Sequence, residues 1–147
     1  MPRSQSSAAV SSDGERWFLL NASPDIHRQL SCLPGPLPSG IRHVAVEGIV
    51  ATDAELDHTL GLVLLREARR LQLYATSAVR SILDRDSRLL RVTEAFAKVK
   101  VTELPLNGRV PLTYRDGESS GITVEAFAVP AGPPRFSPRA ADGHTVG

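Results

Sequence analysis

The side chains best suited to chemistry lie together in one short segment of the chain. Four potential metal ligands fall within six positions: Asp53, Glu55, Asp57 and His58. Carboxylate and imidazole groups together suit Fe(II), Mn or Zn, because these metals accept oxygen and nitrogen ligands. A loop that leaves the C-terminal end of a strand can turn several side chains into one cavity. The segment is therefore a candidate metal site.

The same four residues have a second interpretation that involves no ligand. Asp53 and Glu55 can be acids that the positive end of a helix dipole favours at a helix start. Asp57 and His58 can be an ordinary pair of polar side chains on the surface. The residue types and their spacing leave both interpretations open.

A buried strand and a helix are expected on either side of this segment. Residues 44–51 form a mostly apolar run of the length of a strand buried on both faces. Apolar residues then recur near helical spacing from Asp57 to about Arg70. The four polar residues should therefore lie on the loop between a strand and a helix.

The rest of the chain predicts further strands and short helices. Residues 6–10 and 17–20 read as a hairpin, because Asp13-Gly14 supplies the positive φ of a tight turn. Ser23 is a plausible N-cap for a helix over residues 24–30. Further predicted elements are a strand over 71–75, a helix capped by Thr76 and running to about Asp84, a strand over 99–104, strands over 110–114 and 122–129 around the turn Asp116-Gly117, and a poorly ordered tail over 130–147.

This order of elements predicts the α/β class, with a mixed sheet and helices in layers. Residues 1–147 are the size of one domain. They supply one sheet and one helical layer, so a sandwich with helices on both sides would need a second half. We therefore expect a single, incomplete domain that leaves apolar surface uncovered.

Composition excludes several classes of partner. The formal net charge of +1 provides no field that would favour nucleic acid or an anionic membrane. The apolar stretches fall far short of the roughly 20 residues that a membrane-spanning helix needs. The first residues lack the apolar centre of a secretory signal, and Cys32 is the single cysteine. A cytoplasmic location without membrane insertion is expected.

Several segments resemble known families. Residues 52–61 are similar to the metallo-β-lactamase superfamily signature T-H-x-H-x-D-H-x-x-G: Asp57, His58 and Gly61 match, whereas Asp53 and Glu55 replace histidines. The same replacement, the following L-R-E, the stretch R-S-Q-S-S-A-A-V and the phrase N-A-S-P-D-I all resemble the PqqB family. That family serves the biosynthesis of pyrroloquinoline quinone (PQQ).

The resemblance implies a fold, an activity and a site. The fold would be about one half of the αββα metallo-β-lactamase sandwich. The activity would be metal-dependent hydroxylation of tyrosine in the PQQ precursor peptide by a non-haem iron oxygenase, with Fe(II) or Zn(II) held weakly in this chain. Asp57 and His58 are the expected catalytic residues and metal ligands. Asp53 and Glu55 are further ligands or groups that orient them, and Asn21, Ser23 and Asp25 are candidates for lining the site.

Two other functions remain open at this stage. A non-catalytic carrier could bind PQQ or its precursor and assist its transport to the periplasm. Alternatively, the chain could be an inactive, truncated remnant, because members of the family are longer. They begin with a cysteine cluster that resembles a structural zinc site, so no such site is expected here. The sequence leaves the oligomeric state open.

Overall fold

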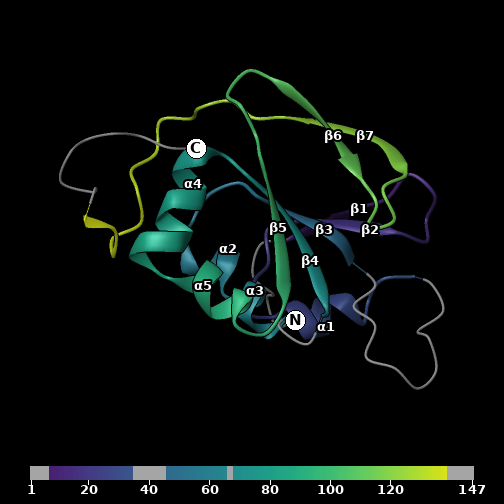
Figure 1. The fold of residues 1–147 in the computed structure, drawn as a ribbon, viewed down its shortest axis with the longest axis horizontal. Helices are drawn as coiled ribbons and strands as arrows, with labels where there is room; N and C mark the ends of the chain where they lie inside the picture. Colours follow the sequence, from purple (N-terminus) through teal and green to yellow (C-terminus); the bar gives the residue numbers. More distant parts are fainter. Residues whose placement is uncertain (1–6, 35–45, 66–67, 139–147) are drawn as a thin grey trace, which may run out of the picture.

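A mixed sheet of five strands forms the centre of the molecule (Figure 1). The computed structural model describes residues 7–34, 46–65 and 68–138. The first two strands run antiparallel, and each later strand runs parallel to its neighbour. In order across the sheet, the strands are β1 (Ala8–Val10), β2 (Trp17–Leu20), β3 (Val46–Ala51), β4 (Arg70–Ala75) and β5 (Lys98–Glu103).

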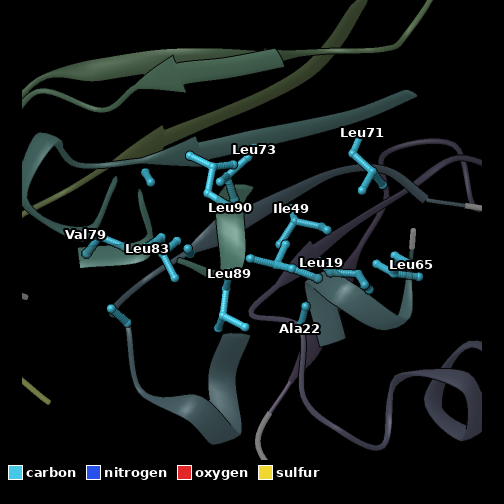
Figure 2. Packing of buried hydrophobic residues seen from close by; sticks show 14 of the residues in the cluster. Leu19, Ala22, Ile49, Leu65, Leu71, Leu73, Val79, Leu83, Leu89 and Leu90 are labelled. Atoms are coloured by element: carbon cyan, nitrogen blue, oxygen red, sulfur yellow. The ribbon is translucent and has the colours of Figure 1, made fainter. Parts of the chain in front are cut away.

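Short helices cover one face of this sheet (Figure 1). Alternate strand residues, among them Leu19, Ile49 and Leu73, pack against apolar side chains of the helical layer such as Leu83 and Leu90 (Figure 2). Burial of these side chains is the main source of stability. The helical elements are α1 (Ile26–Leu30), α2 (Leu56–Thr59), α3 (Gly61–Leu64), α4 (Ser77–Ser81), the π-helical turn η1 (Ile82–Asp86) and α5 (Leu89–Glu94).

A hairpin of β6 (Arg109–Thr113) and β7 (Ser119–Glu125) packs on the opposite face of the sheet. Phe18 stacks on Tyr114 of the hairpin with ring centroids 5.7 Å apart, and Tyr74 packs in the same cluster. The predicted α/β class, with one helical layer on a mixed sheet, is confirmed. The face opposite the helices is less exposed than the sequence predicted, because the β6–β7 hairpin covers part of it.

A cluster of charges ties the hairpin to the turn between β1 and β2. The Arg16 guanidinium lies 3.5 Å from the centre of the Tyr114 ring and bridges Asp13, Asp116 and Glu118. The backbone N–H of Arg16 donates to the Asp13 carboxylate and is the main reason that the pKa of Asp13 lies well below its usual range. These groups are exposed, so the cluster sets the orientation of the hairpin more than its stability.

The helix predicted from Asp57 to about Arg70 is wrong in extent. It is broken between α2 and α3 and ends at Leu64, while β4 begins at Arg70. The break occurs because the Gly61 N–H donates to the carbonyl of Ala22, 2.8 Å away, in the neighbouring loop. A hydrogen bond from outside the helix thus replaces the bond that would have continued it.

Other boundaries also differ from prediction. The helix that Thr76 caps continues as a π-helical turn to Asp86, and α5 was not predicted. β7 ends at Glu125 rather than at residue 129, and the next residue, Ala126, forms only an isolated bridge with Leu106 in the segment between β5 and β6. Residues 44 and 45 of the predicted third strand, residue 6 of the first and residues 139–147 of the predicted tail lie outside the described residues.

None of the helices in the described part of the chain is long and apolar enough to cross a membrane. The cytoplasmic location and the poor order of the tail stay predictions. Residues 130–138 contain only a turn and single-residue features, and the Ser137 hydroxyl donates to Asp86, 2.6 Å away.

Replacing Gly61 by Ala should destabilise the fold. A Cβ atom there would lie 2.5 Å from the carbonyl oxygen of Ser23 and 2.6 Å from that of Ala22, so backbone would have to move. Overpacking of this kind costs about 1–3 kcal/mol of unfolding free energy. Urea unfolding measures it, with Gly132→Ala as the control, because a Cβ at Gly132 meets nothing within 4 Å. Equal stability of the two variants would contradict this close approach.

Candidate functional site

The loop after β2 is bonded to both segments that carry the candidate ligands. The Ala22 N–H donates to the carbonyl of His58 at 2.7 Å, and the Gly61 N–H donates back to the carbonyl of Ala22. The Asn21 N–H donates to the carbonyl of Val50 at the end of β3. Ala22 is fully buried. The loop over residues 21–23 therefore holds the end of β3 at Val50 and the backbone of the helical segment at His58 and Gly61.

Asn21 joins the ends of β2 and β3 through its side chain. Its Oδ1 accepts from both the backbone N–H and the hydroxyl of Thr52, each at 3.0 Å. Its backbone φ is +66°, a left-handed value that Asn tolerates better than most residues. Asn21 is buried and turned toward Thr52, so it positions the residue that immediately precedes Asp53.

Ser23 and Asp25 occupy the turn before α1. Ser23 is fully buried, donates to the side chain of Gln29 and accepts from the Asp25 N–H. The prediction that Ser23 is the N-cap is wrong: α1 begins at Ile26, and Asp25 holds the cap position without a capping side-chain bond. The turn closes instead through the bond from the Ile26 N–H to the Ser23 carbonyl. A site-lining role for Ser23 and Asp25 stays a prediction.

Asp53 and His58 form the central contact of the site. The Nδ1 atom of His58 lies 2.8 Å from Oδ1 and 2.7 Å from Oδ2 of Asp53. In the neutral tautomer with the proton on Nδ1, that N–H donates to the Asp53 carboxylate and Nε2 keeps its lone pair. The Asp53 carboxylate is itself fixed, because its Oδ1 accepts from the Glu55 N–H. The pair is therefore oriented before any ligand arrives.

Asp57 lies near Nε2, the ring nitrogen of His58 that does not contact Asp53. Its Oδ2 is 3.8 Å from Nε2 of His58. The side chain of His58 is 22% exposed and that of Asp57 is 54% exposed, so both are accessible from solvent. An imidazole nitrogen and a carboxylate in this position fit a metal ion as two of its ligands.

The four predicted ligands are not gathered into one cluster. Among the residues that the structure describes, no group of three His, Cys, Asp or Glu side chains is placed to hold a metal. Asp53 contacts Nδ1 of His58, Asp57 lies near Nε2, and Glu55 borders a neighbouring pocket with Asp53. The geometry therefore assembles two candidate ligands and one orienting carboxylate.

A largely apolar pocket of about 440 Å³ adjoins the site. It lies at the C-terminal end of β3, between the main sheet and residues 124–134. Val50 and Leu104 line it from the sheet, and Phe127 and Val129 line it from the segment after β7. The sequence did not indicate this wall, because the pattern over residues 122–129 predicts a strand there. The apolar run over residues 126–129, which breaks the alternation of residues 122–125, was the available signal.

Comparisons with known proteins give matches over nearly the whole chain. A family model described as β-lactamase superfamily domain matches residues 16–147. Coenzyme PQQ synthesis protein B from Methylococcus capsulatus is 38% identical over 144 residues, which cover 97% of this chain and 46% of the relative. The protein of the same name from Methylobacterium nodulans is 40% identical, over 80% of this chain and 44% of the relative.

A solved structure agrees with these matches. The crystal structure of Zn²⁺-bound PqqB from Methylobacterium extorquens superposes with a TM-score of 0.75 at 33% identity. The match covers 100% of this chain and 46% of the solved chain. The chain thus spans about half the length of the relatives it matches, and the resemblance inferred from the sequence motifs is confirmed.

Replacing Asn21 by Gly should remove the side-chain hydrogen bonds that connect the ends of β2 and β3. Glycine keeps the positive φ but removes the acceptor for Thr52, which leaves a partly buried backbone N–H without its partner. The expected loss of unfolding free energy is about 1–3 kcal/mol. Asn107→Gly is the matched control, because Asn107 also has a positive φ but is exposed. If both variants lose the same stability in thermal unfolding, the side-chain bonds contribute nothing.

Proposed function

This chain belongs to the β-lactamase superfamily, and from that premise we propose that it takes part in the biosynthesis of PQQ. Its similarity to proteins named coenzyme PQQ synthesis protein B supports this role. More specifically, we propose that it contributes part of a metal-dependent oxygenase that hydroxylates tyrosine in the precursor peptide. Asp57 and His58 are the proposed ligands and catalytic residues.

The contact between Asp53 and His58 is the observation that carries the proposal. Histidines that bind a metal commonly donate their other ring N–H to a carboxylate, which fixes the ring and raises the basicity of the ligating nitrogen. The 2.7 Å contact at Nδ1 has this form and leaves Nε2 toward Asp57. An isolated surface histidine would need no such partner. Asp53, which replaces a superfamily histidine, is thus an orienting group in this proposal.

The proposed reaction inserts one atom of O₂ into a C–H bond of tyrosine. The second oxygen atom leaves as water, with two electrons and two protons from a reductant. The metal would supply a site at which oxygen and substrate meet. His58 and Asp57 would hold the metal, Asp53 would keep the imidazole oriented, and Glu55 at the pocket would face the substrate.

The choice of metal in this proposal depends on the proposed reaction. A related protein is described as Zn²⁺-bound, which supports metal binding in this family. Zinc has no redox chemistry, whereas Fe(II) bound by histidine and carboxylate ligands serves in oxygenases. We therefore propose Fe(II) as the active metal and Zn(II) as an ion that can take the same ligands. Two protein ligands leave the rest of the coordination sphere to water, so binding in this chain alone should be weak.

A carrier role is the second candidate, and the apolar pocket favours it. A volume of about 440 Å³ next to polar side chains is suited to a small organic molecule. A carrier for PQQ or its precursor would need this pocket but no redox-active metal. The two candidates differ in their dependence on His58.

Metal titration tests the ligand set. His58→Ala should abolish binding of Fe(II) or Zn(II) under anaerobic conditions, and Asp53→Asn should weaken it about 10–100-fold by removing the orienting carboxylate. Binding should also decline as the pH falls, because a protonated imidazole cannot coordinate. His27→Ala is the control, since His27 is exposed on α1. Unchanged binding in His58→Ala would refute the site.

Activity distinguishes the oxygenase from the carrier. The protein, tested alone and extended to the relatives' full length, is incubated with Fe(II), oxygen, a reductant and a tyrosine-containing precursor peptide. We expect the peptide to gain the mass of one oxygen atom with the extended protein and to remain unchanged with its His58→Ala variant. PQQ binding that survives His58→Ala, without any oxygenation by either protein, would favour the carrier.

A further inference from the structure

A second pocket lies at the other end of the parallel strands, away from the candidate metal site. The site follows the C-terminal end of β3, whereas this pocket lies at the first residues of β4 and β5. Its volume is about 270 Å³. Four cationic side chains border it and define what we call the basic groove: Arg70, Lys98, Lys100 and Arg115.

The register of the sheet brings three of these cations together. Arg70 pairs with Lys98 across the parallel strands, and Gln72 pairs with Lys100 on the next rung of the same face. The alternate residues of β5, Val99 and Val101, pack against the helical core. Both lysines therefore project from the face that carries the hairpin. Like charges placed opposite each other on neighbouring strands destabilise a sheet unless something neutralises them.

The neighbouring acid neutralises only one of the four cations. Glu47 accepts from the backbone N–H of Arg115 at 2.7 Å and pairs with its guanidinium at 3.4 Å. Within the described residues, no carboxylate forms a salt bridge with Arg70, Lys98 or Lys100. The groove therefore concentrates positive charge that the described part of the protein leaves unbalanced.

The other polar groups at the groove already have hydrogen-bond or ring partners within the protein. The Gln72 amide donates to the carbonyls of Glu47 and Thr113, so it holds the hairpin on the sheet. The Tyr114 ring lies under Arg16, and its hydroxyl donates to Asp13. The walls of the groove are thus rigid, and the three unbalanced cations remain to meet a ligand.

The sequence adds an independent observation. The chain contains fifteen arginines but only two lysines, and both lysines are in the groove. Lysine presents a compact charge with three donors, which suits a phosphate oxygen as well as arginine suits a planar carboxylate. The two residues stand at positions i and i+2 of β5, so their side chains lie on the same face of the sheet.

We propose that the basic groove binds the phosphate group of a small phosphorylated molecule. A phosphate concentrates two negative charges and several acceptor oxygens in one group, so it can contact Arg70, Lys98 and Lys100 at once. A single carboxylate has half the charge and fewer acceptors. The inference is independent of the metal site and of the proposed oxygenase.

Acylation of the two lysines tests where the ligand binds. The whole chain is treated with an amine-reactive acylating reagent at about 0.15 M salt, a concentration that screens exposed charges, and modification is read by peptide mass spectrometry. Saturating pyrophosphate should slow modification of Lys98 and Lys100 about fivefold, because amines bonded to phosphate are poorer nucleophiles. A lysine-containing peptide added to the sample is the reference for any direct effect of pyrophosphate on the reagent. Equal modification with and without pyrophosphate would overturn the proposal.

Calorimetric titration with pyrophosphate tests the charge requirement. The double variant Lys98→Gln/Lys100→Gln should bind at least about tenfold more weakly, as expected for lost hydrogen bonds to charged donors. Arg80→Gln/Arg85→Gln is the control, because it removes the same charge from two exposed residues of the helical layer. Equal losses in both variants would show a general charge effect and refute a site. Citrate binding as strong as that of pyrophosphate would refute the assignment to phosphate.

Discussion

The close approach of the loop over residues 21–23 to the start of the helical layer is the constraint on which the site depends. Ala22 exchanges hydrogen bonds with His58 and Gly61, and the absence of a side chain at Gly61 is what allows the two backbones to meet. One residue of the loop therefore interrupts the helix and fixes His58 at the same time. Because Ala22 is buried, the backbone contacts that it makes with His58 and Gly61 are closely packed and rigid.

The two faces of the main sheet pack against different parts of the molecule. One face holds the larger core against the helices and supplies most of the buried apolar surface. The other face is divided along the strands: Phe18, Val50 and Tyr74 pack under the hairpin, whereas the first residues of β4 and β5 on that face are basic. The hairpin thereby separates an apolar pocket from a charged groove. Arg16, stacked on Tyr114, links the hairpin to the turn after β1.

Hydrogen bonds from neighbouring residues hold the side chains of the candidate metal site in place. Asn21 holds Thr52, the next residue Asp53 holds His58, and each contact lies within hydrogen-bond distance. Such a chain of contacts orients a ligand at no further cost when the metal binds. The chain spans about half the length of the relatives it matches. In the proposed site, water would fill the coordination positions that His58 and Asp57 leave open.

The sequence alone determined the α/β class, the strands of the main sheet and the loop that carries Asp53 and Glu55, because apolar periodicity and turn residues are local signals. It placed Asp57 and His58 on that loop as well, which is wrong, because both lie in the short helix α2. It could not show that the helix after Asp57 is broken, since the break depends on the distant carbonyl of Ala22. The resemblance of the sequence motifs ranked Asp57 and His58 above Asp53 and Glu55, but it left open whether Asp53 and Glu55 bind the metal or orient its ligands. Only the tertiary structure separated Asp53 as the partner of Nδ1 from Asp57 near Nε2, because side-chain contacts are set by how the loop packs and not by spacing along the chain.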